Sequence, residues 1–220
     1  MLKREDFSRE RIDAIIAEIR EHGPFEALSH EEREADRRQF LSRLPAGEDL
    51  WVFGYGSLIW NPAFHYTETR AARLFGYHRS FCLHLTIGRG SAENPGLMLA
   101  LDKGGSCNAL AFRIAAEQIE SETEILWMRE MISGAYIPKY GNLKTEKGVV
   151  KGLVFVINRK HSRYLGDLGL DKTAEMLRNG QGPLGTCGEY LENTIEQLKM
   201  IGIQDRYLLK IQQKIKQGRH

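Results

Sequence analysis

The segment Val52–Trp60 has the sequence VFGYGSLIW, and it is the first part of the chain whose residue types could form a ligand-binding site. Gly54-Tyr55-Gly56-Ser57 follows an apolar strand, and glycine permits the positive φ angles and close approach that a tight backbone turn needs. Successive amides in such a turn can form a concave site for a carboxylate or a phosphate. An ordinary bend from a strand into a loop would use the same residues, so both interpretations stay open on turn chemistry alone.

Three familiar glycine motifs do not fit this turn. A dinucleotide-binding fingerprint needs a third glycine at position 59, where the chain has Ile59. A phosphate-binding loop needs Gly-Lys followed by Ser or Thr, and this sequence is absent here. A nucleophile elbow needs glycines two residues on either side of Ser57, where Tyr55 and Ile59 stand. We therefore interpret the turn as a backbone cradle for a small acidic group, and Ser57 as a nucleophile is the lesser alternative.

The second candidate for chemistry is Glu130, on a helix predicted from about Ala116 to Ile132. At about 100° per residue, Ile119 and Leu126 fall on one line, and Glu130 lies within roughly 20° of Ile119. A carboxylate on this core-facing stripe is desolvated, which raises its pKa and suits it to act as a general base. The alternative is a buried glutamate that pairs with a distant arginine or with backbone amides.

The other charged residues of this helix are not expected to interact with Glu130. Arg129 should point elsewhere, because adjacent helical residues diverge by about 100°. The other acidic side chains considered lie well off the stripe and are expected in solvent: Glu117, Glu122 and Glu124.

Composition excludes several classes of protein. The 220 residues carry 31 basic and 29 acidic side chains, and this balance gives no field that would attract nucleic acid. No apolar run approaches the roughly 18 residues of a membrane helix, and the charged first residues do not match a signal peptide. Cys82, Cys107 and Cys187 are far apart and odd in number, which argues against a disulfide framework or a structural zinc site. We expect a cytoplasmic protein without a metal or other cofactor, whose partner is a small molecule and neither nucleic acid nor membrane.

The chain divides into an arm, residues 1–48, and a main domain, residues 49–220. In the arm, apolar residues with helical spacing predict a first helix that ends near His22-Gly23-Pro24: Ile12, Ile15, Ile16 and Ile19. A second helix is predicted to open at Ser29, where Glu32 completes a capping box, and to break at Pro45-Ala46-Gly47. We expect both helices to pack on the main domain; an interaction module for an unknown protein partner is the alternative.

The main domain is predicted to be α+β, with a curved sheet or small barrel. Its predicted strands are Leu50–Phe53, Arg70–Phe75, Arg79–Ile87, Gly96–Leu101, Cys107–Ile114 and Val149–Asn158. Helices come late, with two or three more expected over 171–217. Because strands and helices do not alternate strictly, a doubly wound parallel sheet is not expected.

Taken together, these residues resemble the ChaC family, the glutathione-specific γ-glutamylcyclotransferases. Val52–Trp60 is similar to the signature of that family, and the resemblance covers about residues 50–210. Further matches follow in the order of the family: Phe75–Phe81 (FGYHRSF), Arg89-Gly90, Pro95-Gly96, Gly104–Cys107 (GGSC), Arg129-Glu130 with Gly134-Ala135-Tyr136, and Gly188–Leu191 (GEYL). Two departures are the long arm and Ala135, where a second glycine is common.

The resemblance implies a small mixed β-barrel surrounded by helices and the cleavage of glutathione to 5-oxoproline and cysteinylglycine. In that reaction the α-amine of the substrate attacks its own γ-carbonyl, so one carboxylate suffices as base and acid. Glu130 is the expected catalytic residue, and Tyr190 is expected to bind the substrate or the oxyanion. For Arg89 two roles stay open: it pairs with the glycine carboxylate, or it is a structural arginine in a turn. The residues expected to bind the substrate are Gly54, Tyr55, Gly56, Ser57, Leu58, Ile59, Arg89 and Tyr190.

Two other functions remain possible on this sequence. The same fold could act on another γ-glutamyl amine, which a comparison of glutathione with γ-glutamyl-alanine would separate. A non-enzymatic regulatory or binding protein, associated with cation transport, would release no cysteinylglycine from glutathione.

Overall fold

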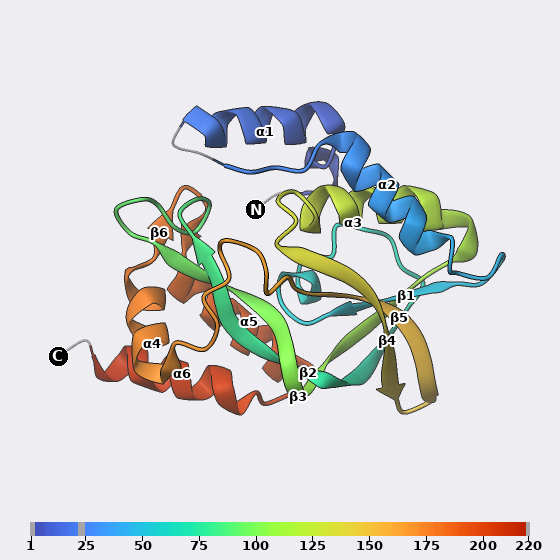
Figure 1. Ribbon diagram of the computed structural model, residues 1–220. Helices are drawn as coiled ribbons and strands as arrows, with labels where there is room; N and C mark the ends of the chain where they lie inside the picture. The colour runs from blue at the N-terminus through green and yellow to red at the C-terminus, as the bar shows by residue number, and fades with distance from the viewer. Residues whose placement is uncertain (1–2, 22–24, 219–220) are drawn as a thin grey trace.

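The computed structural model describes residues 3–21 and 25–218, which are arranged around a closed barrel in the order β1-β3-β2-β4-β5 (Figure 1). The strands of the barrel are β1 (Leu50–Gly54), β2 (Glu68–Leu85), β3 (Gly96–Ile114), β4 (Tyr136–Thr145) and β5 (Gly148–Ile157). β1 closes the barrel, because it pairs antiparallel with β3 on one side and parallel with β5 on the other. The predicted α+β class with a small barrel is confirmed.

Helices surround this barrel and a short two-stranded sheet accompanies them. The helices are α1 (Arg9–Glu21), α2 (His30–Leu41), α3 (Ile119–Glu130), α4 (Gly169–Asn179), α5 (Cys187–Met200) and α6 (Arg206–Gln217). Single turns of 3-10 helix are η1 (Arg4–Asp6), η2 (Ser57–Ile59) and η3 (Ala116–Gln118), and the two-stranded sheet is β6 (Gln181–Gly182) with β7 (Gly185–Thr186). No helix in residues 3–21 and 25–218 has the length and apolar character needed to cross a membrane.

Two long strands replace four predicted short ones. β2 continues through Gly76 and β3 through Gly104-Gly105, where the sequence predicted breaks. These glycines have positive φ angles, and the β2–β3 register shifts between Phe75 and Tyr77. Glycine therefore marks a β-bulge here, which bends a paired strand without ending it.

β4 was not predicted from the sequence, because Pro138 and Gly141 interrupt its apolar pattern. Pairing with β5 along its whole length supplies the stability that its composition lacks. β4 pairs with β2 only over Leu143–Thr145, so Pro138 lies where the strand has one partner and the missing N–H is tolerated.

β1 is buried on both faces and joins the two main apolar cores. Trp51 and Phe53 pack in a core shared with the C-terminal helices, while Leu50 and Val52 pack in a core shared with Trp127 of α3. Alternate side chains of a strand point to opposite faces, so four consecutive residues serve both cores. The glycine turn at the end of β1 is thus anchored from two sides.

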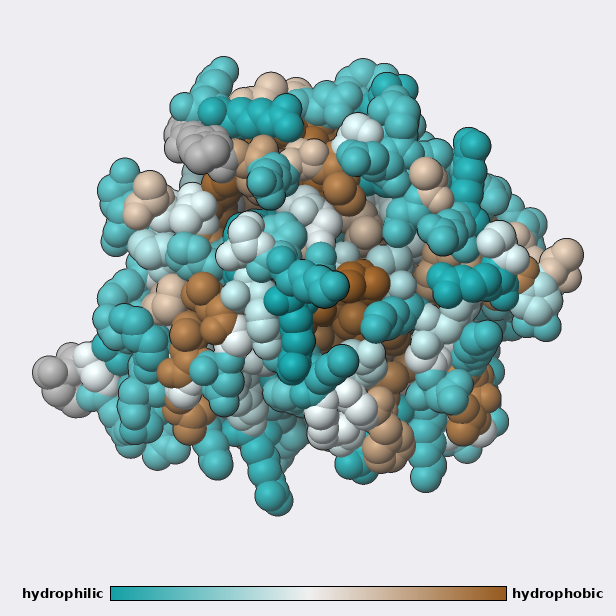
Figure 2. Space-filling model, in the orientation of Figure 1, coloured by the Kyte–Doolittle hydropathy of each residue, from teal (hydrophilic) through white to brown (hydrophobic). Residues whose placement is uncertain are grey.

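The arm packs on α3, the helix that ends in Glu130. In α1, Ile12 and Ile16 are buried in a cluster with Ile125 and Met128 of α3. Figure 2 shows apolar side chains gathered directly beneath α1, whose outer face is hydrophilic. The predicted end of this helix at His22-Gly23-Pro24 lies outside the described residues.

The predicted start of α2 is confirmed. The Glu32 amide donates to Ser29 Oγ at 3.0 Å, and the Ser29 amide donates to Glu32 Oε2 at 2.7 Å. α2 ends at Leu41, earlier than predicted, with Ser42 as its C-terminal cap.

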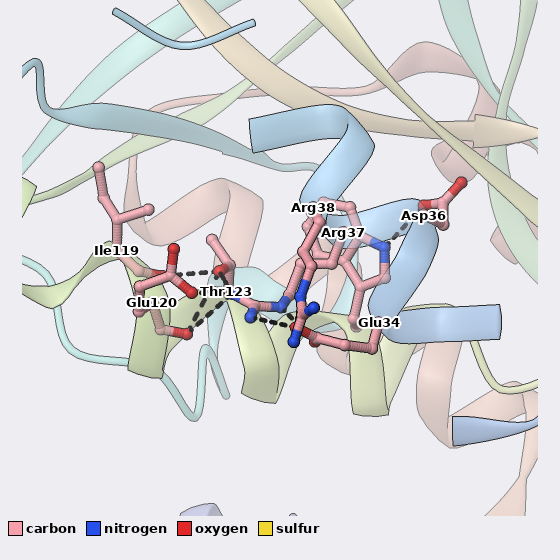
Figure 3. A network of polar contacts seen from close by, with 8 residues as sticks. Glu34, Asp36, Arg37, Arg38, Ile119, Glu120 and Thr123 are labelled. Carbon is pink, nitrogen blue, oxygen red and sulfur yellow. Dashed lines mark hydrogen bonds and ion pairs between the residues drawn. The ribbon is translucent and has the colours of Figure 1, made fainter. Parts of the chain in front are cut away.

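Arg37 of α2 reaches across to α3 (Figure 3). Its Nη1 donates to Thr123 Oγ1 at 2.9 Å and to Glu120 Oε2 at 2.8 Å, while Glu34 of its own helix holds Nε. Trp127 Nε1 of α3 donates to Asp36 at 2.7 Å. These bonds fix the position of α3 against the arm.

Glu122 corrects one prediction, because its side chain is only 2% exposed and does not lie in solvent. Arg4 Nη2 donates to Glu122 Oε1 at 2.8 Å, and the His65 amide donates to Oε2 at 2.7 Å. Burial raises the pKa of Glu122, but the hydrogen bonds from Arg4 and His65 outweigh it, so the pKa lies below its ordinary value. Helical projection could not reveal this, since the arm and the loop before β2 bury this side of α3.

Arg4→Met is expected to destabilise the protein by about 2 kcal/mol, because it leaves a buried carboxylate without its charged donor. Because the pKa of Glu122 is lower in the folded protein than in the unfolded one, near 4.5, this carboxylate stabilises the fold at pH values above 4.5. The contribution is lost as the pH falls through the folded pKa. The deficit should therefore be measurable at pH 7 by urea denaturation and shrink below about pH 4. Arg11→Met, at an exposed position of α1, is the matched control. Equal stability of both variants at pH 7 would contradict the role of Arg4.

Candidate active site

A cavity of about 340 Å³ lies where the glycine turn, the end of α3 and the N-terminal arm meet. Its volume is within the range of small-molecule sites. Its polar lining residues are Tyr55, Ser57, Arg129, Glu130, Ser133, Tyr136, Arg163 and Tyr190. Gly56 and Leu58 of the turn also line it, with apolar residues from β2, β3 and the arm.

Glu130 is the single carboxylate that lines this cavity. It is the last residue of α3, and its side chain is 15% exposed. Burial raises its pKa above the ordinary value, and the neighbouring Arg129 opposes but does not cancel this shift. A carboxylate with a raised pKa in a cavity can accept a proton from a substrate near neutral pH and return it.

Arg129 corrects the expectation that it would point away from Glu130. Its Nε lies 3.0 Å from Glu130 Oε1. Because the helix ends here, the long guanidinium arm can fold back along the last turn toward the carboxylate. Arg129 Nη2 also donates to Ser57 Oγ at 2.8 Å, and Nη1 donates to the Asn61 carbonyl. One guanidinium thus ties Glu130 to the glycine turn, which lies about seventy residues earlier in the chain.

The glycines of the turn are needed for close packing, and the expected positive φ angles are absent from both. A Cβ on Gly54 would lie 2.7 Å from Phe112 Cε2, and a Cβ on Gly56 would lie 2.7 Å from Tyr190 Oη. Gly56 has a negative φ of −134°, but its ψ of −126° lies outside the α and β regions that residues with a Cβ favour. Gly56 therefore lets the Tyr190 hydroxyl approach the backbone beside Ser57.

The hydrogen bonds of Ser57 do not favour a nucleophilic serine. Its hydroxyl accepts from Arg129, and an arginine in a protein cannot take up the proton that a nucleophile must lose. Among residues 3–21 and 25–218, no histidine lines the cavity.

Three tyrosines surround Glu130. Burial raises the pKa of Tyr55, Tyr136 and Tyr190, to about 12 for Tyr190, and the nearby Glu130 carboxylate raises each further. All three hydroxyls therefore stay protonated at neutral pH and can donate to an anion. Tyr136 Oη also donates to the Leu99 carbonyl at 3.2 Å.

The remaining predicted site residues lie behind the wall of the cavity. Gly54 packs under Phe112, and Ile59 packs against the apolar core. Arg89 donates to the Thr186 carbonyl at 2.8 Å, and its guanidinium carbon lies 5.8 Å from the centre of the Tyr190 ring. Arg89 thus supports the start of α5, from which Tyr190 projects.

Several residues of the cavity wall were not predicted from the sequence as part of a site. They come from four separate segments: Ile19 and Phe25, Ser133 and Tyr136, Arg163, and Leu184. Tyr136 could have been found from its place six residues after Glu130 in a matched motif. The others carry no local signal, because only the tertiary structure brings them to the cavity. Within the residues that the structure describes, no three His, Cys, Asp or Glu side chains are grouped as metal ligands would be.

The profile of the ChaC-like proteins matches residues 50–218, which hold the barrel, α3 and the C-terminal helices. The chain belongs to the ChaC-like family. Glutathione-specific γ-glutamylcyclotransferase of Escherichia coli K12 is 42% identical over 178 residues, which are 80% of this chain and 77% of the relative. Glutathione-specific γ-glutamylcyclotransferase 1 of Homo sapiens is 31% identical, over 74% of this chain and 76% of that protein.

Solved structures share the fold. The crystal structure of the yeast γ-glutamylcyclotransferase specific to glutathione aligns with a TM-score of 0.70 at 23% identity, over 78% of this chain and 97% of that one. YkqA of Bacillus subtilis aligns with a TM-score of 0.53 at 17% identity, over 82% of this chain and 58% of that one. At these identities the likeness concerns the fold, and it supports the barrel with surrounding helices.

Proposed function

We propose that this chain is a γ-glutamylcyclotransferase that cleaves glutathione to 5-oxoproline and cysteinylglycine. The observation that carries the proposal is a single carboxylate, Glu130, which burial desolvates at the wall of a cavity of tripeptide size. The relative from E. coli, at 42% identity, is named for this activity.

The reaction needs one base because the substrate supplies its own nucleophile. Glu130 takes a proton from the α-ammonium, and the free amine attacks the γ-carbonyl carbon to close the five-membered lactam. The bond from that carbon to the cysteine nitrogen then breaks as Glu130 returns the proton to the departing amine. The second proton of the attacking nitrogen passes to the same amine, which leaves as an ammonium. Atoms and charge balance without water or an added reagent.

The other residues of the cavity take supporting roles in this proposal. The turn 54–59 binds the γ-glutamyl unit through its backbone and Ser57, and the Tyr190 hydroxyl donates to the developing oxyanion. Arg129 fixes the position of the turn relative to Glu130 through its hydrogen bonds to Ser57 and Asn61. Positioning of this kind lowers the barrier because both reacting groups lie in one molecule.

The experiment that tests the function uses purified protein and glutathione. We expect 5-oxoproline and cysteinylglycine in equal amounts, and slower release from γ-glutamyl-alanine. Faster turnover of γ-glutamyl-alanine would assign the same fold to another γ-glutamyl amine. No 5-oxoproline from either compound would reject the enzyme and favour a regulatory protein.

We also propose that the activity belongs to the cytoplasm. Cys82, Cys107 and Cys187 are all free and buried, which suits a reducing compartment.

A further inference from the structure

Arg163 is a cation in the cavity wall that the proposed reaction does not use. It lies in the loop between β5 and α4, at Asn158–Leu168, and lines the same cavity as Glu130. Its Nη2 donates to Ser133 Oγ, and its guanidinium carbon lies 5.5 Å from the centre of the Phe25 ring. Phe25 belongs to the arm, outside residues 50–218, which the family profile covers.

The guanidinium of Arg163 has no acidic partner among the described residues. No carboxylate of residues 3–21 and 25–218 lies within 4.0 Å of it, although eleven other arginines form such pairs. Burial lowers its pKa, since its charge has lost water without gaining a counter-ion. A half-buried cation of this kind is stabilised by an anion that enters the cavity.

The position of Arg163 relative to Glu130 indicates which anion it binds. The charge of Arg129 lowers the pKa of Glu130, whereas Tyr136 raises the pKa of Arg163. The pKa of Tyr136 is itself raised by Glu130 and lowered by Arg163. All three residues line the cavity, and Glu130 forms its ion pair with Arg129 and none within 4.0 Å with Arg163. The α-ammonium and the α-carboxylate of glutathione share one carbon, so the α-carboxylate must stay beside Glu130. The second carboxylate, on glycine, lies at the other end of the tripeptide.

We propose that Arg163, stacked on Phe25 of the arm and hydrogen-bonded to Ser133, binds the glycine carboxylate of glutathione. This inference rests on the proposed function and moves to Arg163 the role that the sequence suggested for Arg89. Phe25 is a positioning residue here, because it holds the flat face of the guanidinium. The arm thereby contributes to substrate specificity as well as to the packing of α3.

The test compares glutathione with its glycine monoethyl ester, in which a neutral ester replaces the charged carboxylate that Arg163 is proposed to bind. Wild-type protein is expected to prefer glutathione, in kcat/KM, by roughly 10- to 100-fold. Arg163→Gln should raise KM for glutathione by a similar factor, leave kcat nearly unchanged, and bring the ratio of the two substrates close to one. Arg163→Lys should restore part of the preference. Lys160→Gln removes the same charge from an exposed position of the same loop and should keep the wild-type ratio.

Several outcomes would overturn the assignment. A wild-type ratio in Arg163→Gln would show that the arginine does not bind this carboxylate. An equal fall in kcat/KM for both substrates would place Arg163 at the γ-glutamyl end. Should Arg163→Gln fail to fold, Phe25→Leu tests the same subsite, because a misplaced guanidinium must also lower the ratio. Absence of 5-oxoproline from both substrates with wild-type protein would instead reject the proposed function.

Discussion

Glu130→Gln is expected to lower kcat for glutathione by about 100- to 10,000-fold, the usual contribution of a general base. Glutamine keeps the size of the side chain and a hydrogen-bond acceptor for Arg129, but it cannot accept the proton of the α-ammonium. Affinity for glutathione should change little, because the turn and Arg163, the groups proposed to bind the substrate, are intact. Release of 5-oxoproline gives kcat, and calorimetric titration of the variant gives the affinity.

Glu124→Gln is the matched control, because Glu124 lies exposed on the same helix. It should retain wild-type kcat. Turnover of glutathione by Glu130→Gln at the wild-type rate would show that another group moves the proton.

Thermal unfolding of Glu130→Gln should show that its loss of activity does not come from a loss of stability. The folded pKa of Glu130 is raised above its unfolded value near 4.5, so the protonated form favours folding and this stability is lost as the pH rises through the folded pKa. At pH 7 to 8 the buried charge costs stability that glutamine does not, and Glu130→Gln should therefore melt at a higher temperature than wild type. The difference should vanish below about pH 4.5, where both states of the wild type are protonated. A lower melting temperature at pH 8 would contradict the direction of this pKa shift.

Arg129→Gln is expected to reduce kcat on the order of 100-fold, because the bond to Ser57 and the charge beside Glu130 both disappear. Arg129 opposes the rise in the pKa of Glu130, so its removal raises that pKa further. The acidic limb of the kcat profile should then move to higher pH. Initial rates of 5-oxoproline release between pH 5 and 9 measure both effects.

Arg129→Lys divides these two contributions. It keeps a positive charge near Glu130, but a single ammonium cannot reproduce the fork that reaches Ser57 and the Asn61 carbonyl together. For Arg129→Lys, the acidic limb of the pH profile of kcat should stay near that of wild type, while kcat itself remains low. If Arg129→Gln left the acidic limb in place, the ion pair with Glu130 would have no influence on the base.

The sequence by itself determined the features that depend on local order. Helical periodicity predicted α1 and the stripe that holds Ile119 and Leu126, and the capping box predicted the start of α2. Glu130 was found in the same way, because a helix of known pitch fixes which face each residue occupies. The glycine turn was found from its composition and from the resemblance of its motif to a family signature.

Only the tertiary structure decided which groups meet in space. β4 exists because β5 pairs with it, and Glu122 is buried because Arg4 and the loop at His65 cover it. Arg163 and Phe25 reach the cavity from segments about 140 residues apart, and nothing in either segment marks it as part of a site. Burial, pairing and desolvation depend on neighbours distant in the chain, whereas periodicity and capping need only a few adjacent residues. This physical difference explains why Glu130 could be singled out from the sequence and the wall of the cavity around it could not.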